Sequence, residues 1–190
     1  MKKYKYTAVR ANQAKGHDVF SFAASPTDVL NFSEIERVGR QEDGQLKGFQ
    51  RHQISGHIKE IRDYLKRDDA LLPNAVIVAF IDNVEIKEIG SGITEVTIDA
   101  RKNKPGFVVD GQQRLTSLSG IEKPGFQVFV SALICKDYNE LRQQFVLINN
   151  TRPLPKTLIY ELLPTVDGLP ERFTARSFAA KMVDRLNYTP

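Results

Sequence analysis

The most informative stretch of the chain is Phe107-Val108-Val109-Asp110-Gly111-Gln112-Gln113-Arg114-Leu115-Thr116-Ser117-Leu118. Its first three residues form a short apolar run, which predicts a buried strand. The residues after Gly111 predict a helix that ends near Gly120. A strand that meets a helix at a glycine turn directs several backbone N–H groups to one point, and the helix dipole adds partial positive charge there. Such a corner suits an anion.

The side chains of this corner suit a nucleotide. Arg114 can donate twice to a phosphate, Gln112 and Gln113 can donate or accept, and Thr116 could cap the helix or reach a metal-bound water. Asp110 could pair with Arg114, coordinate Mg²⁺, or orient a water for attack on a phosphoryl group. By spacing alone, an ordinary capped helix with a surface arginine is the stronger interpretation, because the stretch is neither a Walker motif nor a dinucleotide fingerprint.

Strands and helices alternate along the chain without a regular βαβ rhythm, which favours a mixed α/β or α+β domain. Strands are expected at Tyr4–Arg10, Asp18–Phe22, Asn74–Ile81, Val84–Ile89, Ile93–Ile98, Phe107–Val109 and Gln127–Ile134. Helices are expected at Gln50–Leu65, at Asp110–Leu118, from Asp137 to about Asn150, and from Pro170 onward. The glycine-containing segment Ser33–Gly48 is expected to be a long loop.

The first of these helices carries isoleucines and leucine at helical spacing, so one face should be buried. At 100° per residue, Arg51 projects close to the edge of that apolar face, beside a pocket. An ordinary surface ion pair is the other interpretation of Arg51. The apolar residues that define the face are Ile54, Ile58, Ile61 and Leu65.

The helix that follows Asp137 starts with a capping box, in which Asp137 accepts from the N–H three residues on and Glu140 reaches back. Its apolar face should carry Tyr138, Leu141, Phe145 and Ile148. Asn149 falls near the edge of that face. It could point into the same cleft as the glycine turn or act as a helix C-cap, and local pattern does not separate the two.

The composition is that of an ordinary soluble globular protein of 190 residues, with 27 Lys and Arg against 23 Asp and Glu and a formal net charge of +4. No apolar run approaches the roughly 20 residues of a membrane helix, and Met1–Tyr6 lacks the apolar stretch of a signal peptide. The single Cys135 suits a reducing cytosol, so a cytoplasmic location without a membrane partner is expected. The mild basic excess permits a polyanionic partner and demands none.

Three ordered elements resemble the DGQHR/DGQQR domain proteins of DNA-modification systems. The string Asp110–Thr116 is similar to their signature, and Phe145–Leu154 resembles the Phe-x-x-Ile-Asn segment that follows it. Gly48–Arg51 resembles the Tyr/Phe-Gln-Arg element near the start of the same domain. The resemblance spans Gly48 to Leu154 and is more specific than any one motif.

These families include DndB, from DNA phosphorothioate modification systems, and DpdB, from systems that insert 7-deazaguanine bases into DNA. The chain is more similar to DpdB, because Gln113 replaces the His of the DGQHR form. The wider similarity is to ParB and sulfiredoxin-like domains, whose Gly-x-x-Arg turn binds nucleotide phosphates, and more distantly to GmrSD-type restriction enzymes. The resemblance implies a ParB-like mixed-sheet fold over 1–154, followed by a C-terminal helical extension over 155–190.

The resemblance also implies a site that binds ATP, or another nucleoside triphosphate, with Mg²⁺. Catalytic roles fall on Asp110, Gln113 and Arg114, with Asp110 also on the metal. Gly111 and Arg114 correspond to the phosphate-binding turn. The expected nucleotide-binding residues are Gln50, Arg51, Gly111, Gln112, Arg114, Thr116 and Asn149.

Two functions remain open from the sequence. One is an ATPase that serves a separate DNA-modifying enzyme, such as a guanine transglycosylase-like protein. The other is a non-catalytic DNA-binding regulator or adaptor of a phosphorothioate or related modification-restriction system, which uses the same site to hold a nucleotide or a DNA phosphate. A nuclease is a third possibility, which rests only on the similarity to restriction enzymes. No clustered carboxylate pair that would support it is evident in the sequence.

Overall fold

The computed structural model describes residues 2–13, 15–35, 39–40, 46–47, 55–149, 178–183 and 185–186. By its internal contacts the chain divides into two units, Met1–Asn150 and Thr151–Pro190. The predicted domain boundary between residues 154 and 155 stays a prediction.

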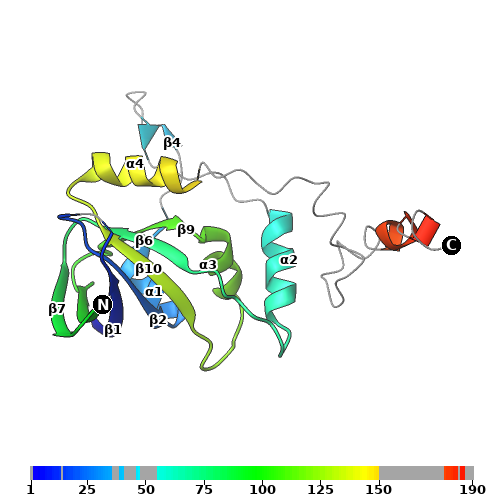
Figure 1. Cartoon of the computed structure of the whole chain (residues 1–190), viewed down its shortest axis with the longest axis horizontal. Helices are drawn as coiled ribbons and strands as arrows, with labels where there is room; N and C mark the ends of the chain where they lie inside the picture. Colours follow the sequence, from blue (N-terminus) through cyan, green and yellow to red (C-terminus); the bar gives the residue numbers. More distant parts are fainter. Residues whose placement is uncertain are drawn as a thin grey trace. The chain divides into compact units, whose positions relative to one another are not determined.

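A mixed sheet organises the first unit (Figure 1). Its strands are β1 (Lys3–Ala11), β2 (Val19–Ala24), β3 (Ser33–Glu34), β6 (Val76–Phe80), β7 (Val84–Gly90), β8 (Ile93–Asp99), β9 (Gly106–Asp110) and β10 (Val128–Ile134). The strand order is β3-β9-β6-β10-β2-β1-β8-β7. Two further short strands, β4 (Gly39–Arg40) and β5 (Leu46–Lys47), pair with each other.

The sheet combines antiparallel hairpins with parallel pairs, and the α+β class is therefore confirmed. Neighbouring strands are antiparallel from β10 through β2, β1 and β8 to β7. β6 runs parallel to β10 and antiparallel to β9, while β3 runs parallel to β9. The predicted strands form because their apolar residues either alternate, as in β1, or run continuously where both faces are covered, as in β6 and β9.

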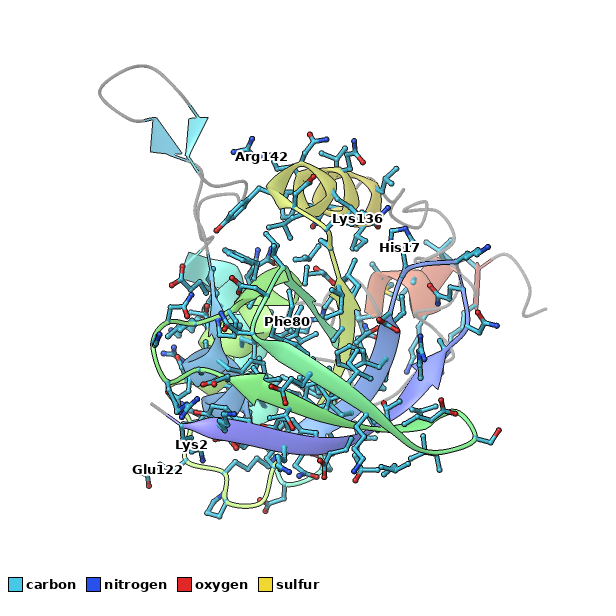
Figure 2. All side chains as sticks on the ribbon, turned by 90° about the vertical axis from the view of Figure 1, so that its left-hand side faces the viewer. Lys2, His17, Phe80, Glu122, Lys136 and Arg142 are labelled. Carbon is cyan, nitrogen blue, oxygen red and sulfur yellow. The ribbon has the colours of Figure 1, made fainter. Side chains whose placement is uncertain are left out.

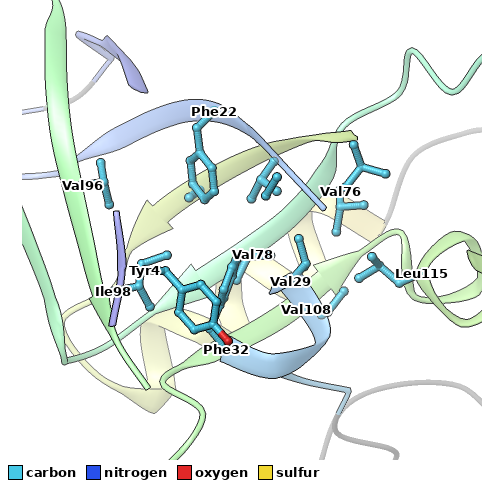
Figure 3. Packing of buried hydrophobic residues seen from close by; sticks show 14 of the residues in the cluster. Tyr4, Phe22, Val29, Phe32, Val76, Val78, Val96, Ile98, Val108 and Leu115 are labelled. Carbon is cyan, nitrogen blue, oxygen red and sulfur yellow. The ribbon is translucent and has the colours of Figure 1, made fainter. Parts of the chain in front are cut away.

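Helices cover both faces of the sheet. They are α1 (Pro26–Phe32), α2 (Ser55–Leu65), α3 (Gln112–Leu118) and α4 (Tyr138–Asn149). Val108 belongs to the larger core, which also holds side chains of α1, α2 and α3 (Figure 3). Its neighbours Phe107 and Val109 belong to a second core, which Leu141 of α4 closes. Because adjacent residues of a strand face opposite sides, β9 is buried between the two cores.

Two helix predictions agree with the structure where it describes them. In α2, Ile58 and Leu65 are buried and Ile61 packs against the core, while 50–54 lie outside the described residues. At the start of α4 the Glu140 N–H donates to Asp137 Oδ1 over 2.8 Å. Glu140 reaches back as expected, but its Oε2 accepts from the N–H of Lys136 over 2.7 Å.

Two features differ from the sequence prediction. Helix α1 was not expected, although Ser25 caps it by accepting from the Asp28 N–H over 3.0 Å and Pro26 occupies its first turn. That Ser-Pro pair is a helix-start signal. The single long loop expected over Ser33–Gly48 is wrong, since β3 adds to the sheet edge beside β9, and β4 and β5 pair with each other further along the segment. A two-residue strand has no periodicity to read, so its pairing depends on tertiary contact.

In the second unit the structure describes a helix over 178–183 and 185–186. Its apolar residues Phe178, Met182, Val183 and Leu186 are exposed. Residues 170–177, where this helix was expected to begin, lie outside the described residues. Within the part of the chain that the structure describes, no helix is long and apolar enough to cross a membrane.

Candidate functional site

The strand β9 passes into α3 through a turn that only glycine can make. Asp110 is the last residue of β9, and Gly111 has a left-handed φ of +92°. A Cβ at Gly111 would lie 3.1 Å from Val76 Cγ2 and 3.2 Å from both Val76 Cα and Arg114 Nη2. Glycine is therefore required both by φ and by the close packing of β6 against the turn. No side chain caps the start of α3.

Arg114 does not lie on the surface, contrary to the simplest interpretation of the sequence. Its side chain is 17% exposed. Its Nη1 donates to the carbonyl oxygens of Asn74 and Ala75, over 2.6 and 3.0 Å. Its Nη2 donates to Asp110 Oδ2 over 2.8 Å. These bonds use three of the five guanidinium donors and join the β9–α3 corner to the segment that leads into β6.

Of the three roles considered for Asp110, the structure shows the pairing with Arg114. The side chain of Asp110 is 42% exposed, so its carboxylate remains accessible from solvent. Among the described residues, no group of three or more His, Cys, Asp or Glu side chains could hold a metal ion. Magnesium in nucleotide sites is commonly held by one or two carboxylates together with substrate phosphates, and a single accessible Asp110 fits that mode.

The carbonyl of Val109 brings two motif elements together. Gln112 Nε2 donates to this oxygen over 3.2 Å, and Asn149 Nδ2 donates to it over 3.1 Å. Asn149 also donates to the carbonyl of Phe145 over 2.9 Å, so it closes the last turn of α4 as well. Asn149 therefore bonds both the last turn of α4 and the end of β9, beside the β9–α3 corner, and its predicted place in a nucleotide cleft stays a prediction.

Four predicted site residues remain, and the structure describes two of them, Gln113 and Thr116. Gln113 Oε1 is buried without a hydrogen-bond partner, which is costly unless a water or ligand supplies one. Thr116 lies in the second turn of α3, partly buried, and does not cap its start. Gln50 and Arg51 lie outside the described residues, so their predicted place at the site stays a prediction.

Sequence reasoning missed Ser117 and Arg62, which join α3 to α2. Ser117 Oγ lies 3.1 and 2.7 Å from the carbonyl oxygens of Ile58 and Gln113, which share its one O–H donor. Arg62 Nε donates to the Ser117 carbonyl over 3.4 Å. The Arg62 guanidinium lies against Gly120, where an added Cβ would be 3.2 Å from Cζ. A serine in the apolar stripe of α3 was the available signal, because a buried hydroxyl needs a partner.

The comparison with protein families identifies the family of this chain. A family model for DndB, described as DNA-sulfur modification-associated, matches residues 6–169. The chain belongs to the DndB family. The match includes all three sequence elements and every strand of the sheet except the first residues of β1. Involvement in a DNA-modification system is thus confirmed at the level of the family.

No curated protein and no solved structure matches the chain. The ParB and sulfiredoxin likeness of the fold and the closer similarity to DpdB therefore stay predictions. DndB-family membership itself assigns no role to a single residue of the β9–α3 corner.

Proposed function

We propose that this DndB-family protein is the nucleotide-binding component of a DNA-modification system and hydrolyses ATP at the β9–α3 corner. The observation that carries the proposal is the accessible carboxylate of Asp110, held by Arg114 at a left-handed glycine turn. Gln112 and Asn149 both donate to the adjacent Val109 carbonyl, and this shared contact supports the proposal.

In this mechanism the ATP phosphates bind at the first turn of α3, whose N–H groups have no side-chain cap. Asp110 holds Mg²⁺ or orients the attacking water, and the hydrogen bond from Arg114 holds the carboxylate in place. Gln113 is the second candidate for orienting water, because its buried Oε1 has an unused acceptor. Gln50, Arg51 and Thr116 complete the proposed nucleotide contacts.

The partners proposed are DNA and a separate DNA-modifying enzyme in the cytoplasm. The description of the family favours sulfur modification of DNA. The alternative proposal, in which the partner is a transglycosylase-like protein that inserts 7-deazaguanine, rests on the residue type at Gln113 alone.

One observation favours a second candidate, a non-catalytic DNA-binding regulator or adaptor. Asp110 neutralises Arg114, and both Nη1 donors are already bonded to backbone carbonyls. A guanidinium committed in this way contributes little to stabilising the charge that develops during hydrolysis, so the first turn of α3 could hold a nucleotide or a DNA phosphate without turnover. This candidate predicts binding of ATP or DNA with no phosphate release.

The test is phosphate release from ATP and Mg²⁺ by the full chain, with and without DNA, together with titration of ATP by calorimetry. Asp110→Asn is the central variant because it keeps the shape of the side chain. A loss of about 100-fold in turnover is expected when one electrostatic contact at the reacting phosphate is removed.

Asp69→Asn is the matched control, since Asp69 forms a pair of similar length, 2.7 Å, with Arg67 at an exposed turn. If Asp110→Asn and Arg114→Ala are both folded and both keep their ATP turnover, the active site lies elsewhere. ATP binding without turnover in the wild type, with and without DNA, selects the non-catalytic candidate.

A further inference from the structure

Basic residues that are far apart in the sequence gather at one end of the sheet. The pairing of β1 with β8 sets Lys3 opposite Asp99, and the Ala100 N–H donates to the Lys2 carbonyl over 3.2 Å. The turn after β8 follows at once, and Lys2 lies where β1 begins (Figure 2). We call this group the basic corner; it consists of Lys2, Lys3, Arg101, Lys102 and Lys104.

The basic corner has more basic than acidic side chains among its ion pairs. Asp28 pairs with Lys2, and Asp99 pairs with both Lys3 and Arg101. Five basic side chains therefore share two carboxylates.

The charges of the basic corner are layered, with the acidic groups beneath the basic ones. Lys2 is 64% exposed and its partner Asp28 30%, while Arg101 is 61% exposed and Asp99 26%. Arg101 donates to both oxygens of Asp99, which holds the pKa of that carboxyl well below its usual range. Asp99 thus stays ionised and fixes the guanidinium, while the outer surface remains positive.

A pocket of about 320 Å³ lies between two of these lysines. It is lined by Lys2, Tyr4, Asn31 and Lys104. Lys104 Nζ donates to the Leu30 carbonyl at the end of α1, over 2.5 Å, which positions this ammonium group at the pocket. Two ammonium groups and an amide around an open pocket match the needs of a phosphate oxyanion.

We propose that the basic corner binds the sugar-phosphate backbone of double-stranded DNA. Several exposed cations on a short turn and an adjacent strand end suit the closely spaced charges of a duplex. The choice of DNA rests on the membership of a DNA-modification family and not on ATP hydrolysis at the β9–α3 corner. DNA contact of this kind is independent of base sequence.

The test is fluorescence anisotropy with a short labelled duplex over a range of salt concentrations. The variant is the triple substitution Lys2→Gln, Lys3→Gln and Lys102→Gln. The matched control removes the same charge from exposed lysines elsewhere, Lys59→Gln, Lys66→Gln and Lys87→Gln. The triple variant should lose about tenfold or more in affinity for the duplex. The negative slope of log K against log salt should become shallower by about 3, because three phosphate contacts are removed.

The control should change the slope by less than about 1. Equal effects of the two triple variants, or no salt-dependent binding by the wild type, would overturn the proposal. So would tighter binding to phosphatidylserine vesicles than to the duplex. ATP turnover by the triple variant separates this proposal from the proposed function, since the substitutions lie outside the β9–α3 corner.

Discussion

Arg114 Nη2 donates to Asp110 Oδ2 over 2.8 Å across one turn of chain, and this contact closes the corner between β9 and α3. The same guanidinium bonds two carbonyls of the segment that precedes β6. The arginine of the motif is therefore part of the fold as well as of the proposed site.

Replacement of Arg114 should destabilise the fold. Arg114→Ala leaves the carbonyls of Asn74 and Ala75 without this donor, and hydrogen bonds to charged groups contribute about 1.5–3 kcal/mol each in net terms. We expect a loss of about 2–3 kcal/mol in unfolding free energy, measured by chemical denaturation. Arg114→Lys should not restore it, because an ammonium cannot copy the fork. An effect no larger than that of Arg101→Ala, at the exposed pair, would contradict this.

Substitution of Gly111 should cost more than substitution of a left-handed glycine in open space. Gly111→Ala combines positive φ, which costs about 1–3 kcal/mol, with contacts of 3.1–3.2 Å to Val76 and Arg114. Gly125→Ala is the control, since Gly125 has φ +76° and nothing within 4 Å of an added Cβ. Melting temperatures of the two variants measure the difference. Equal destabilisation would show that the packing at Gly111 adds nothing to the cost.

Gln112 and Asn149 should be energetically coupled through the Val109 carbonyl. Each single substitution to alanine leaves that oxygen one side-chain donor, whereas the double variant leaves it neither. The double variant should therefore lose more stability than the sum of the singles, by about 1 kcal/mol. A double-mutant cycle by urea denaturation measures this coupling. Strict additivity would mean that the two side chains act independently.

Cys135 should lower stability at high pH. Burial, with Glu140 and Asp137 nearby, raises the pKa of this thiol from 9.0 to about 11. The folded state then binds the proton more tightly than the unfolded state, so stability is full below pH 9 and falls as the pH rises through 11. Cys135→Ala should remove this part of the slope in unfolding free energy against pH. The thiol should also react with a disulfide reagent only on unfolding, since Cys135 is 1% exposed.

Much of the fold could be predicted from local pattern. The continuous apolar runs of β6 and β9, the alternation in β1 and the spacing of Ile58, Ile61 and Leu65 each depend on the period of one element, so they can be read without tertiary contacts. The candidate site could be predicted only as a motif. The residues from Asp110 to Arg114 are adjacent in sequence, so they predicted the turn between β9 and α3. They did not predict which carbonyl oxygens Arg114 would bond.

What the sequence by itself determined is the class of the fold, the glycine turn between β9 and α3, and the resemblance to DNA-modification proteins. The tertiary structure decided the partners of Arg114, because Asn74 and Ala75 are about 40 residues away and reach it only through the pairing of β6 with β9. It also brought the residues of the basic corner together. Residues 2–3 and 101–104 adjoin only because β1 pairs with β8, and no local periodicity encodes a contact between segments so distant in the chain.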